Sequence, residues 1–179
     1  MNAPLMLKLE NELHQAVHNQ EFVVYYQPII QLDTYQIIAL EALVRWNHPV
    51  RGILLPVDWM GIAERLSLMT TITGQVMDIV IRDYARWSET GLSPCLININ
   101  ITEAMLINGV AFEKLNPDLP SNRNLHLGIE VTESIFFHRS LDTASRQLEL
   151  MHKSGIKIAL DDFGTGFANL SHLRHVACD

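Results

Sequence analysis

The sequence has few of the features that mark a secreted or membrane protein. Its 179 residues include only two cysteines, Cys95 and Cys178, with no spacing that suggests a disulfide framework, and this favours a reducing compartment. No apolar run approaches the ~20 residues that a membrane-spanning helix needs. Residues 1–12 alternate apolar and charged side chains and lack the apolar core of a secretion signal. These absences predict a cytoplasmic protein without a membrane segment.

Positive charge is also scarce. Lysine and arginine number 13 against 20 aspartates and glutamates, so the formal net charge is −7 at pH 7. This excess of negative charge argues against nonspecific binding to DNA and against adhesion to anionic membranes. An anionic substrate would need metal ions and local basic residues to overcome the average field. With 48% hydrophobic and 18% charged residues, the chain is expected to fold as one globular domain with a sizeable core.

The spacing of apolar residues predicts a series of strands and helices. Two β-rich runs, 22–30 and 36–44, are separated by five residues, which can close a hairpin but cannot hold a crossover helix, so these strands should be antiparallel. Strand 125–130, helix 141–154 and strand 156–161 form a β-α-β unit, which implies parallel pairing with a right-handed crossover. The other predicted elements are helices 7–19, 57–66 and 69–89, strand 96–100 and a short helix from about Glu103.

Two adjacent aspartates follow the last predicted strand, in the stretch Asp161-Asp162-Phe163-Gly164-Thr165-Gly166. Neighbouring carboxylates at the end of a buried strand repel each other and lose water, which is costly unless a cation lies between them. The glycines allow the backbone beyond them to turn sharply and to lie close to a ligand. Because Asp-Asp-x-Gly also begins ordinary surface turns, the motif alone leaves both a cation site and a turn open.

The same arrangement recurs upstream. Glu41, Asn100 and Glu130 each follow directly on an apolar run, as Asp161 does. Their oxygens are ligands that Mg²⁺, Mn²⁺ and Ca²⁺ prefer over sulfur. If the strands are parallel neighbours, their carboxyl ends meet on one face of a sheet or barrel, where sites are normally built. One acid in such a position is usually a helix N-cap or a solvated end, but the recurrence favours a divalent-metal site.

Five motifs are spread along the chain. In order they are Tyr25-Tyr26-Gln27-Pro28-Ile29, Glu41-Ala42-Leu43-Val44-Arg45-Trp46, Asn100-Ile101-Thr102, Glu130-Val131-Thr132-Glu133-Ser134 and the stretch that begins at Asp161. This series resembles the EAL domain family, the cyclic di-GMP phosphodiesterases of bacterial second-messenger signalling. The resemblance covers nearly the whole chain from about Glu10.

The resemblance implies a fold. The EAL type is an α/β, TIM-like (β/α)₈ barrel whose first strand runs antiparallel to the rest, in agreement with the hairpin predicted above. A complete barrel typically needs about 250 residues. Residues 1–179 are therefore expected to form a single partial EAL domain, with residues 1–9 as a lead-in helix and only about the first five strands of the barrel present.

The resemblance also implies a metal centre. The expected ligands of one divalent ion, Mg²⁺ or Mn²⁺, are Glu41, Asn100, Glu130 and Asp161, and Asp161 and Asp162 would reach a second ion. The residues with an expected catalytic role are Glu41, Asp161 and Asp162. Two such ions can share a hydroxide and stabilise charge on a phosphodiester oxygen during in-line attack.

Substrate-binding roles follow from the same resemblance. Arg45 would hold a phosphate, for which its planar guanidinium is well suited, although a strand-end arginine paired with Asp58 or Glu64 is the alternative. Gln27 and Leu43 would contact guanine, or else simply fill the barrel. A further resemblance-based role is that of Glu133, which would steady the loop 163–171 that couples metal binding to dimerisation in the family.

Two departures from the family pattern bear on function. The usual Tyr-Ser-Ser is replaced by 167–169, Phe-Ala-Asn, and the family positions past Asp179, which include a water-activating lysine and another metal-ligating glutamate, do not occur. Because these positions include a metal ligand, the chain by itself is expected to bind Mg²⁺ or Mn²⁺ weakly or not at all. It is also expected to be inactive by itself, and whether it acts as an enzyme is left open. The alternative is a non-catalytic EAL-like module that binds cyclic di-GMP or a protein. Expected partners are cyclic di-GMP, a second copy in a homodimer or higher oligomer, and sensor or GGDEF domains fused in a parent protein.

Overall fold

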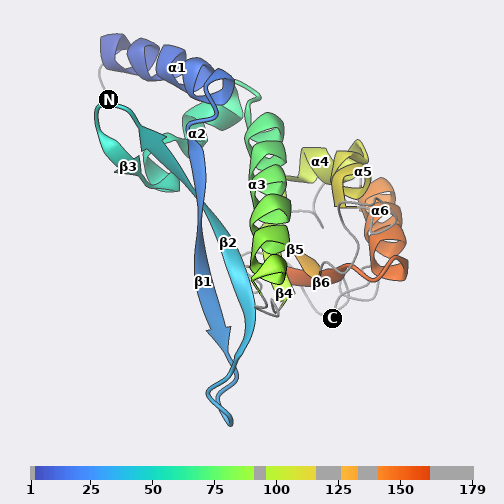
Figure 1. The fold of residues 1–179 in the computed structure, drawn as a ribbon. Coiled ribbons are helices and arrows are strands. Elements are labelled where there is room, and N and C mark those ends of the chain that lie inside the picture. The colour runs from blue at the N-terminus through green and yellow to red at the C-terminus, as the bar shows by residue number, and fades with distance from the viewer. Residues whose placement is uncertain (1–2, 91–95, 116–125, 133–140, 162–179) are drawn as a thin grey trace.

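The structure is a computed structural model that describes residues 3–90, 96–115, 126–132 and 141–161. In these ranges one mixed β-sheet carries helices along its outer side (Figure 1). The helices are α1 Ala3–His18, α2 Pro56–Arg65, α3 Met69–Glu89, α4 Glu103–Ile107, α5 Val110–Leu115 and α6 Leu141–Lys153. The strands are β1 Phe22–Ile30, β2 Ile37–His48, β3 Gly52–Leu54, β4 Leu96–Asn100, β5 Leu127–Thr132 and β6 Lys157–Asp161.

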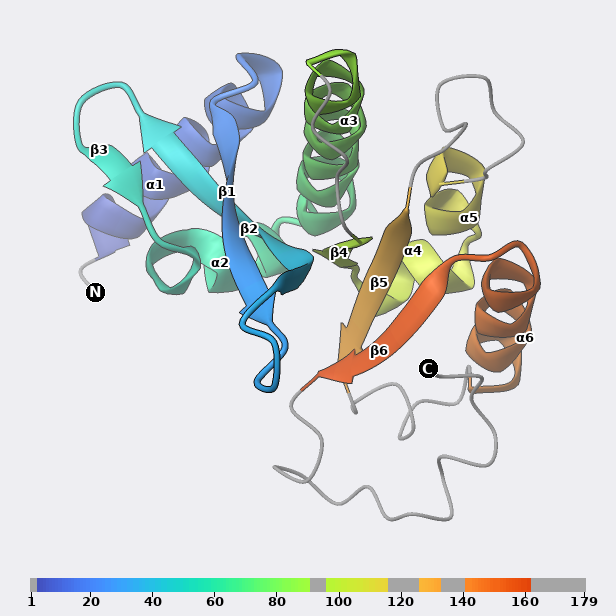
Figure 2. The ribbon, with the colours of Figure 1, turned by 60° about the horizontal axis from the view of Figure 1, so that its bottom comes forward.

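The strand order of the sheet is β1-β2-β4-β5-β6, and β3 pairs with β2 beside this path. β1 and β2 form an antiparallel hairpin, whereas β2, β4, β5 and β6 run parallel to one another. Figure 2 shows β5 and β6 side by side, with α6 packed next to them. The hairpin and the β5-α6-β6 unit confirm the topology predicted from the sequence, an α/β arrangement of TIM-like type with an antiparallel first strand.

The helices pack on the sheet through two apolar clusters. The larger one joins the parallel strands to α3–α6, and Ile97, Ile99 and Ile129 within it are fully buried. The smaller one joins α1 and α2 to the hairpin through buried side chains such as Leu13 and Trp46. Complete burial of an aliphatic side chain of this size contributes about 1.5–3 kcal/mol. These clusters hold the strands in a fixed register and thereby position the side chains on their other face.

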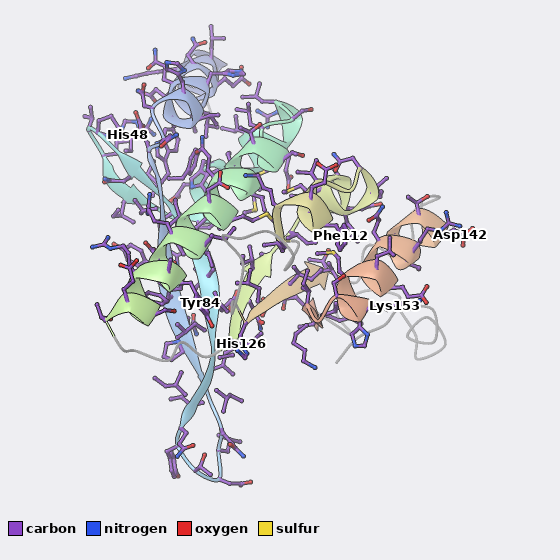
Figure 3. All side chains as sticks on the ribbon, turned by 45° about the vertical axis from the view of Figure 1, so that its right-hand side comes forward. His48, Tyr84, Phe112, His126, Asp142 and Lys153 are labelled. Carbon is purple, nitrogen blue, oxygen red and sulfur yellow. The ribbon has the colours of Figure 1, made fainter. Side chains whose placement is uncertain are left out.

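Helix α3 connects the two halves of the sheet. Its buried stripe includes Ile72, Val76, Val80 and Tyr84, which recur every four residues as one face of a helix requires. At the far end of this stripe the Tyr84 hydroxyl accepts a hydrogen bond of 3.2 Å from the backbone N–H of His126, just before β5 (Figure 3). A single 21-residue helix therefore fixes the hairpin and the parallel strands relative to each other.

The described sheet has six strands where the sequence predicts five. The additional strand, β3, has three residues and pairs antiparallel with the end of β2 after a turn at 49–51, and its first residue, Gly52, has φ +71°. Three residues carry no readable periodicity, so only their hydrogen bonds to β2 define them as a strand. β2 itself runs to His48, beyond the predicted end at Val44. The predicted loop over 116–124 lies outside the described residues.

Candidate active site

The parallel strands carry apolar side chains on one face and polar side chains on the other. In β4, Ile97 and Ile99 are buried against the helices, and Asn98 and Asn100 alternate with them. We call the face that carries Asn98 and Asn100 the inner face and the helix-packed face the outer face. Because residues paired across a ladder project to the same face, the inner face continues onto β2, β5 and β6.

The strand register brings the predicted metal ligands to the inner face. Glu41 of β2 lies opposite Asn98, and Asn100 lies opposite Glu130 of β5. Asp161 ends β6 opposite the last residue of β5, two residues beyond Glu130. The four predicted ligands thus come from four neighbouring strands that share one face of the sheet.

Two of these residues do not occupy the strand position that the sequence predicts. Glu41 and Glu130 each follow directly on an apolar run and were expected near the carboxyl ends of their strands. Instead β2 has 12 residues and continues to His48, beyond the predicted end at Val44, and β5 continues to Thr132, beyond the predicted end at Glu130. The reason is stagger between strands. β2 pairs with β4 only from Ala39 to Ala42, so Glu41 lies near the end of the paired segment even though its strand continues.

Two amide–carboxylate hydrogen bonds link the strands on the inner face. The Asn100 amide nitrogen donates to Oε1 of Glu41 at 3.0 Å, which connects β4 to β2. The Asn98 amide nitrogen donates to Oε1 of Glu130 at 2.9 Å, which connects β4 to β5. Each asparagine therefore orients a carboxylate of an adjacent strand.

The surroundings of Glu130 favour a bound cation. Partial burial is the main cause that raises the pKa of its carboxyl above the ordinary value. The hydrogen bond from Asn98 opposes this rise, whereas the negative charges of Glu41 and Asp161 add to it. Three acids thus interact unfavourably across the inner face, and a divalent cation between them would reverse the sign of that interaction.

The donor set fits a hard divalent ion but is not gathered into a finished cluster. Within the described ranges, no three His, Cys, Asp or Glu side chains stand close enough together to hold a metal ion. Asn100 directs its nitrogen at Glu41, and a half-turn of the amide would present its oxygen instead. Carboxylate and amide oxygens suit Mg²⁺ or Mn²⁺. Two further predicted residues, Asp162 and Glu133, lie outside the described part of the chain.

The predicted substrate-binding residues lie on the same face of the hairpin. Gln27 of β1 is exposed and pairs with Glu41, and Leu43 follows on β2 two residues after Glu41, opposite Tyr25. Arg45 donates to the carbonyl oxygen of Val44 at 2.8 Å, and its guanidinium carbon lies 5.7 Å from the centre of the Tyr25 ring. The inner face therefore extends from the acids along β2 to a basic group.

In the structure Arg45 pairs with neither Asp58 nor Glu64, the two acids of the alternative interpretation. Asp58 accepts a hydrogen bond from the backbone of Leu55 at the start of α2, where it caps the helix. Glu64 faces a cavity instead, and among the described residues Arg45 forms no ion pair.

A cavity of about 380 Å³ opens beside the acids. Its walls include Leu43 of β2, Met60 and Glu64 of α2, and Asn100 and Glu130 of the parallel strands. The cavity forms because β2 diverges from β4 beyond Ala42, so the two strands no longer pair and helices α2 and α3 line the gap. Its size and mostly apolar walls are typical of a small-molecule site with a few polar groups.

Reasoning from the sequence missed Asn98, the second inner-face amide. Residues 96–99 were interpreted as one apolar run, although the alternation Ile97-Asn98-Ile99-Asn100-Ile101 is the pattern of a strand with one polar face. That alternation was the available signal.

A mixed sheet with an antiparallel first strand and acids on the inner face defines the TIM-like class of α/β proteins, whose sites lie toward the carboxyl ends of the strands. The chain belongs to the EAL domain family, whose sequence model matches residues 10–179.

The chain is also similar in sequence to proteins named as cyclic di-GMP phosphodiesterases. The chain is 32% identical over 180 residues to the bifunctional diguanylate cyclase/cyclic di-GMP phosphodiesterase MucR of Pseudomonas aeruginosa, covering 98% of this chain and 26% of MucR. It is 31% identical over 175 residues to the cyclic di-GMP phosphodiesterase PdeR of Escherichia coli, covering 97% of this chain and 26% of PdeR. The chain thus spans about a quarter of the length of these curated relatives.

A solved structure has the same fold. The PaMucR phosphodiesterase in complex with c-di-GMP superposes with a TM-score of 0.77 at 30% sequence identity, over 96% of this chain and 70% of that chain.

Proposed function

We propose that this chain provides the metal-binding and phosphate-binding part of the active site of a cyclic di-GMP phosphodiesterase. The observation that carries the proposal is the convergence of Glu41, Asn100, Glu130 and Asp161 on one face beside a cavity. The names of MucR and PdeR as cyclic di-GMP phosphodiesterases support the choice of substrate.

In this proposal the inner-face residues have distinct tasks. Glu41, Asn100, Glu130 and Asp161 would hold one divalent ion, Mg²⁺ or Mn²⁺, and Asp162 would join Asp161 at a second one. Such ions stabilise charge on a phosphodiester oxygen and make bound water more acidic. Of these residues, the proposed catalytic ones are Glu41, Asp161 and Asp162.

The proposed substrate contacts lie further along the hairpin. Arg45 would bind a phosphate, because a guanidinium has five donors and the contact with Val44 uses few of them. Its stacking on Tyr25 would hold the guanidinium plane in place. Leu43 would contact the face of a guanine from the cavity wall, and Gln27 would contact its polar edge. We also retain Glu133 as the residue that steadies the loop 163–171.

The proposed setting is a bacterial signalling protein of the cytoplasm. Within the described ranges, none of the helices is long and apolar enough to cross a bilayer. The proposed assembly is a homodimer, to be tested by sedimentation at micromolar concentration. Fusion to sensor or GGDEF domains is a further proposal, supported by the bifunctional name of MucR.

The test is conversion of cyclic di-GMP to linear pGpG by the full-length protein that carries this chain, with Mn²⁺ or Mg²⁺ added. We expect metal-dependent conversion that falls at least about 100-fold in Glu41→Gln, because loss of one charged ligand weakens charge stabilisation by several kcal/mol. The matched control is Glu89→Gln, which changes an exposed acid at the end of α3 and should leave the rate unchanged.

Two results would contradict the proposal. Conversion that persists in Glu41→Gln would show that the chemistry takes place elsewhere. Binding of cyclic di-GMP without any conversion would favour the alternative, a non-catalytic binding module of the same fold.

A further inference from the structure

Strand β4 presents two asparagines on the inner face, and the proposed metal site uses only Asn100. Asn98 is 7% exposed, which is rare for an amide unless its hydrogen bonds are satisfied. Its nitrogen donates to Oε1 of Glu130 at 2.9 Å. This buried amide therefore contacts the carboxylate of a proposed metal ligand directly.

The neighbouring strand β5 leaves space for the Asn98 amide. Gly128 of β5 is the register partner of Asn98 and is buried. A Cβ atom at Gly128 would overlap Oδ1 of Asn98 and would also lie 3.4 Å from the backbone oxygen of Lys157 on β6. Gly128 does not have a positive φ, so space and not backbone conformation is what requires glycine here. Asn98 and Gly128 thus form one complementary unit.

The contact restricts the Glu130 carboxylate. A free glutamate side chain rotates about three bonds, and its two oxygens are equivalent. A hydrogen bond to Oε1 from a side chain that is itself fixed by burial and by Gly128 selects one orientation of the carboxylate. The other oxygen, Oε2, is then directed away from Asn98 and can be offered to an ion.

We propose that Asn98, seated against Gly128, is a positioning residue that orients the Glu130 carboxylate for a divalent ion and so sets the metal affinity of the site. The inference rests on the proposed function, because it takes Glu130 to be a ligand. Removing a group that hydrogen-bonds to a metal ligand without touching the metal typically lowers metal affinity by about 10–100-fold.

The test is titration of the full-length protein with Mn²⁺ alone, followed by calorimetry. Asn98→Leu keeps the approximate size and removes the donor, and we expect its Mn²⁺ affinity to fall about tenfold. Asn98→Ala, which also lacks a side-chain donor, serves the same purpose if the leucine variant does not fold. Gly128→Ala should also weaken Mn²⁺ binding, because the added methyl group displaces the Asn98 amide. Gly61→Ala on α2 is the matched control, since its added methyl group meets nothing within 4 Å.

The combination of the two substitutions separates positioning from general destabilisation. If Gly128→Ala acts by displacing the amide, it should weaken Mn²⁺ binding little further once Asn98 has already been replaced by alanine, so the two effects should not add. Activity of the single variants should return toward the wild-type rate at saturating Mn²⁺.

Each result has a defined meaning. Wild-type Mn²⁺ affinity in both Asn98→Ala and Gly128→Ala, together with loss of binding in Glu130→Gln, would overturn this inference and leave the proposed function standing. Absence of Mn²⁺ binding by the wild-type protein would overturn both.

Discussion

The inner and outer faces of the same strands differ in what they contribute. On the outer face Ile97, Ile99 and Ile129 are fully buried in an apolar cluster. On the inner face Asn100 is exposed and Glu130 is only partly buried, and both take part in interactions between polar groups. Apolar burial stabilises the strands, whereas like charges brought together on the inner face oppose folding. The difference indicates that the outer face stabilises the fold, whereas the polar groups of the inner face are available to bind a ligand.

The largest effect that tests this comparison is expected from a matched pair on β4. Ile99→Ala removes a fully buried side chain from the outer face, and we expect the free energy of unfolding to fall by about 2–5 kcal/mol. The neighbouring inner-face variant Asn100→Ala loses an exposed hydrogen bond, and its cost should be below about 1 kcal/mol. Urea unfolding without metal measures both. Equal losses would show that the two faces share the stabilising role.

A smaller effect is expected where the outer face carries a polar contact. The Tyr26 hydroxyl of β1 donates to Oδ2 of Asp83 on α3 at 2.9 Å, and its ring meets Trp87 edge-on at 4.8 Å. Tyr26→Phe keeps the ring contact and removes the hydrogen bond, so we expect a loss of about 1 kcal/mol. Urea unfolding measures this loss. An unchanged free energy of unfolding in Tyr26→Phe would mean that the hydroxyl does not stabilise the packing of the hairpin on α3.

The smallest expected effect is the dependence of stability on pH that Glu130 causes on the inner face. The pKa of the Glu130 carboxyl is raised in the folded chain, chiefly by burial. The folded state thus holds this proton more tightly than the unfolded state, so stability falls as the pH rises from the ordinary pKa of 4.5 through the raised value. Glu130→Gln should reduce that fall in metal-free protein. Unfolding curves between about pH 4 and pH 8 measure it, and an unchanged slope in the variant would contradict the attribution to Glu130.

The topology could be predicted from the sequence because it depends on local signals. The connection between 22–30 and 36–44 is too short for a helix, so an antiparallel hairpin follows, and the β-α-β pattern near residue 141 requires parallel strands. The acids Glu41, Glu130 and Asp161 were selected as candidates because each follows an apolar run, and the structure brings them to one face.

What the sequence did not predict depends on contacts between distant segments. The bond between Tyr26 and Asp83 joins residues 57 positions apart, and no periodicity signals it. The position of Glu41 within β2 depends on the stagger between β2 and β4, which is set by packing. The role of Asn98 was hidden because its importance comes from Gly128 and Glu130 on the next strand.

The central claim is that the inner face binds a divalent ion, and thermal unfolding with increasing Mn²⁺ tests it most directly. A ligand that binds only the folded state stabilises it, and at about 100 times the dissociation constant the melting temperature should rise by about 5–10 °C. We predict this rise for the wild-type protein and for Glu89→Gln, and its absence for Glu130→Gln and Asn100→Leu. The same rise in all four proteins, or none in the wild type, would contradict the account.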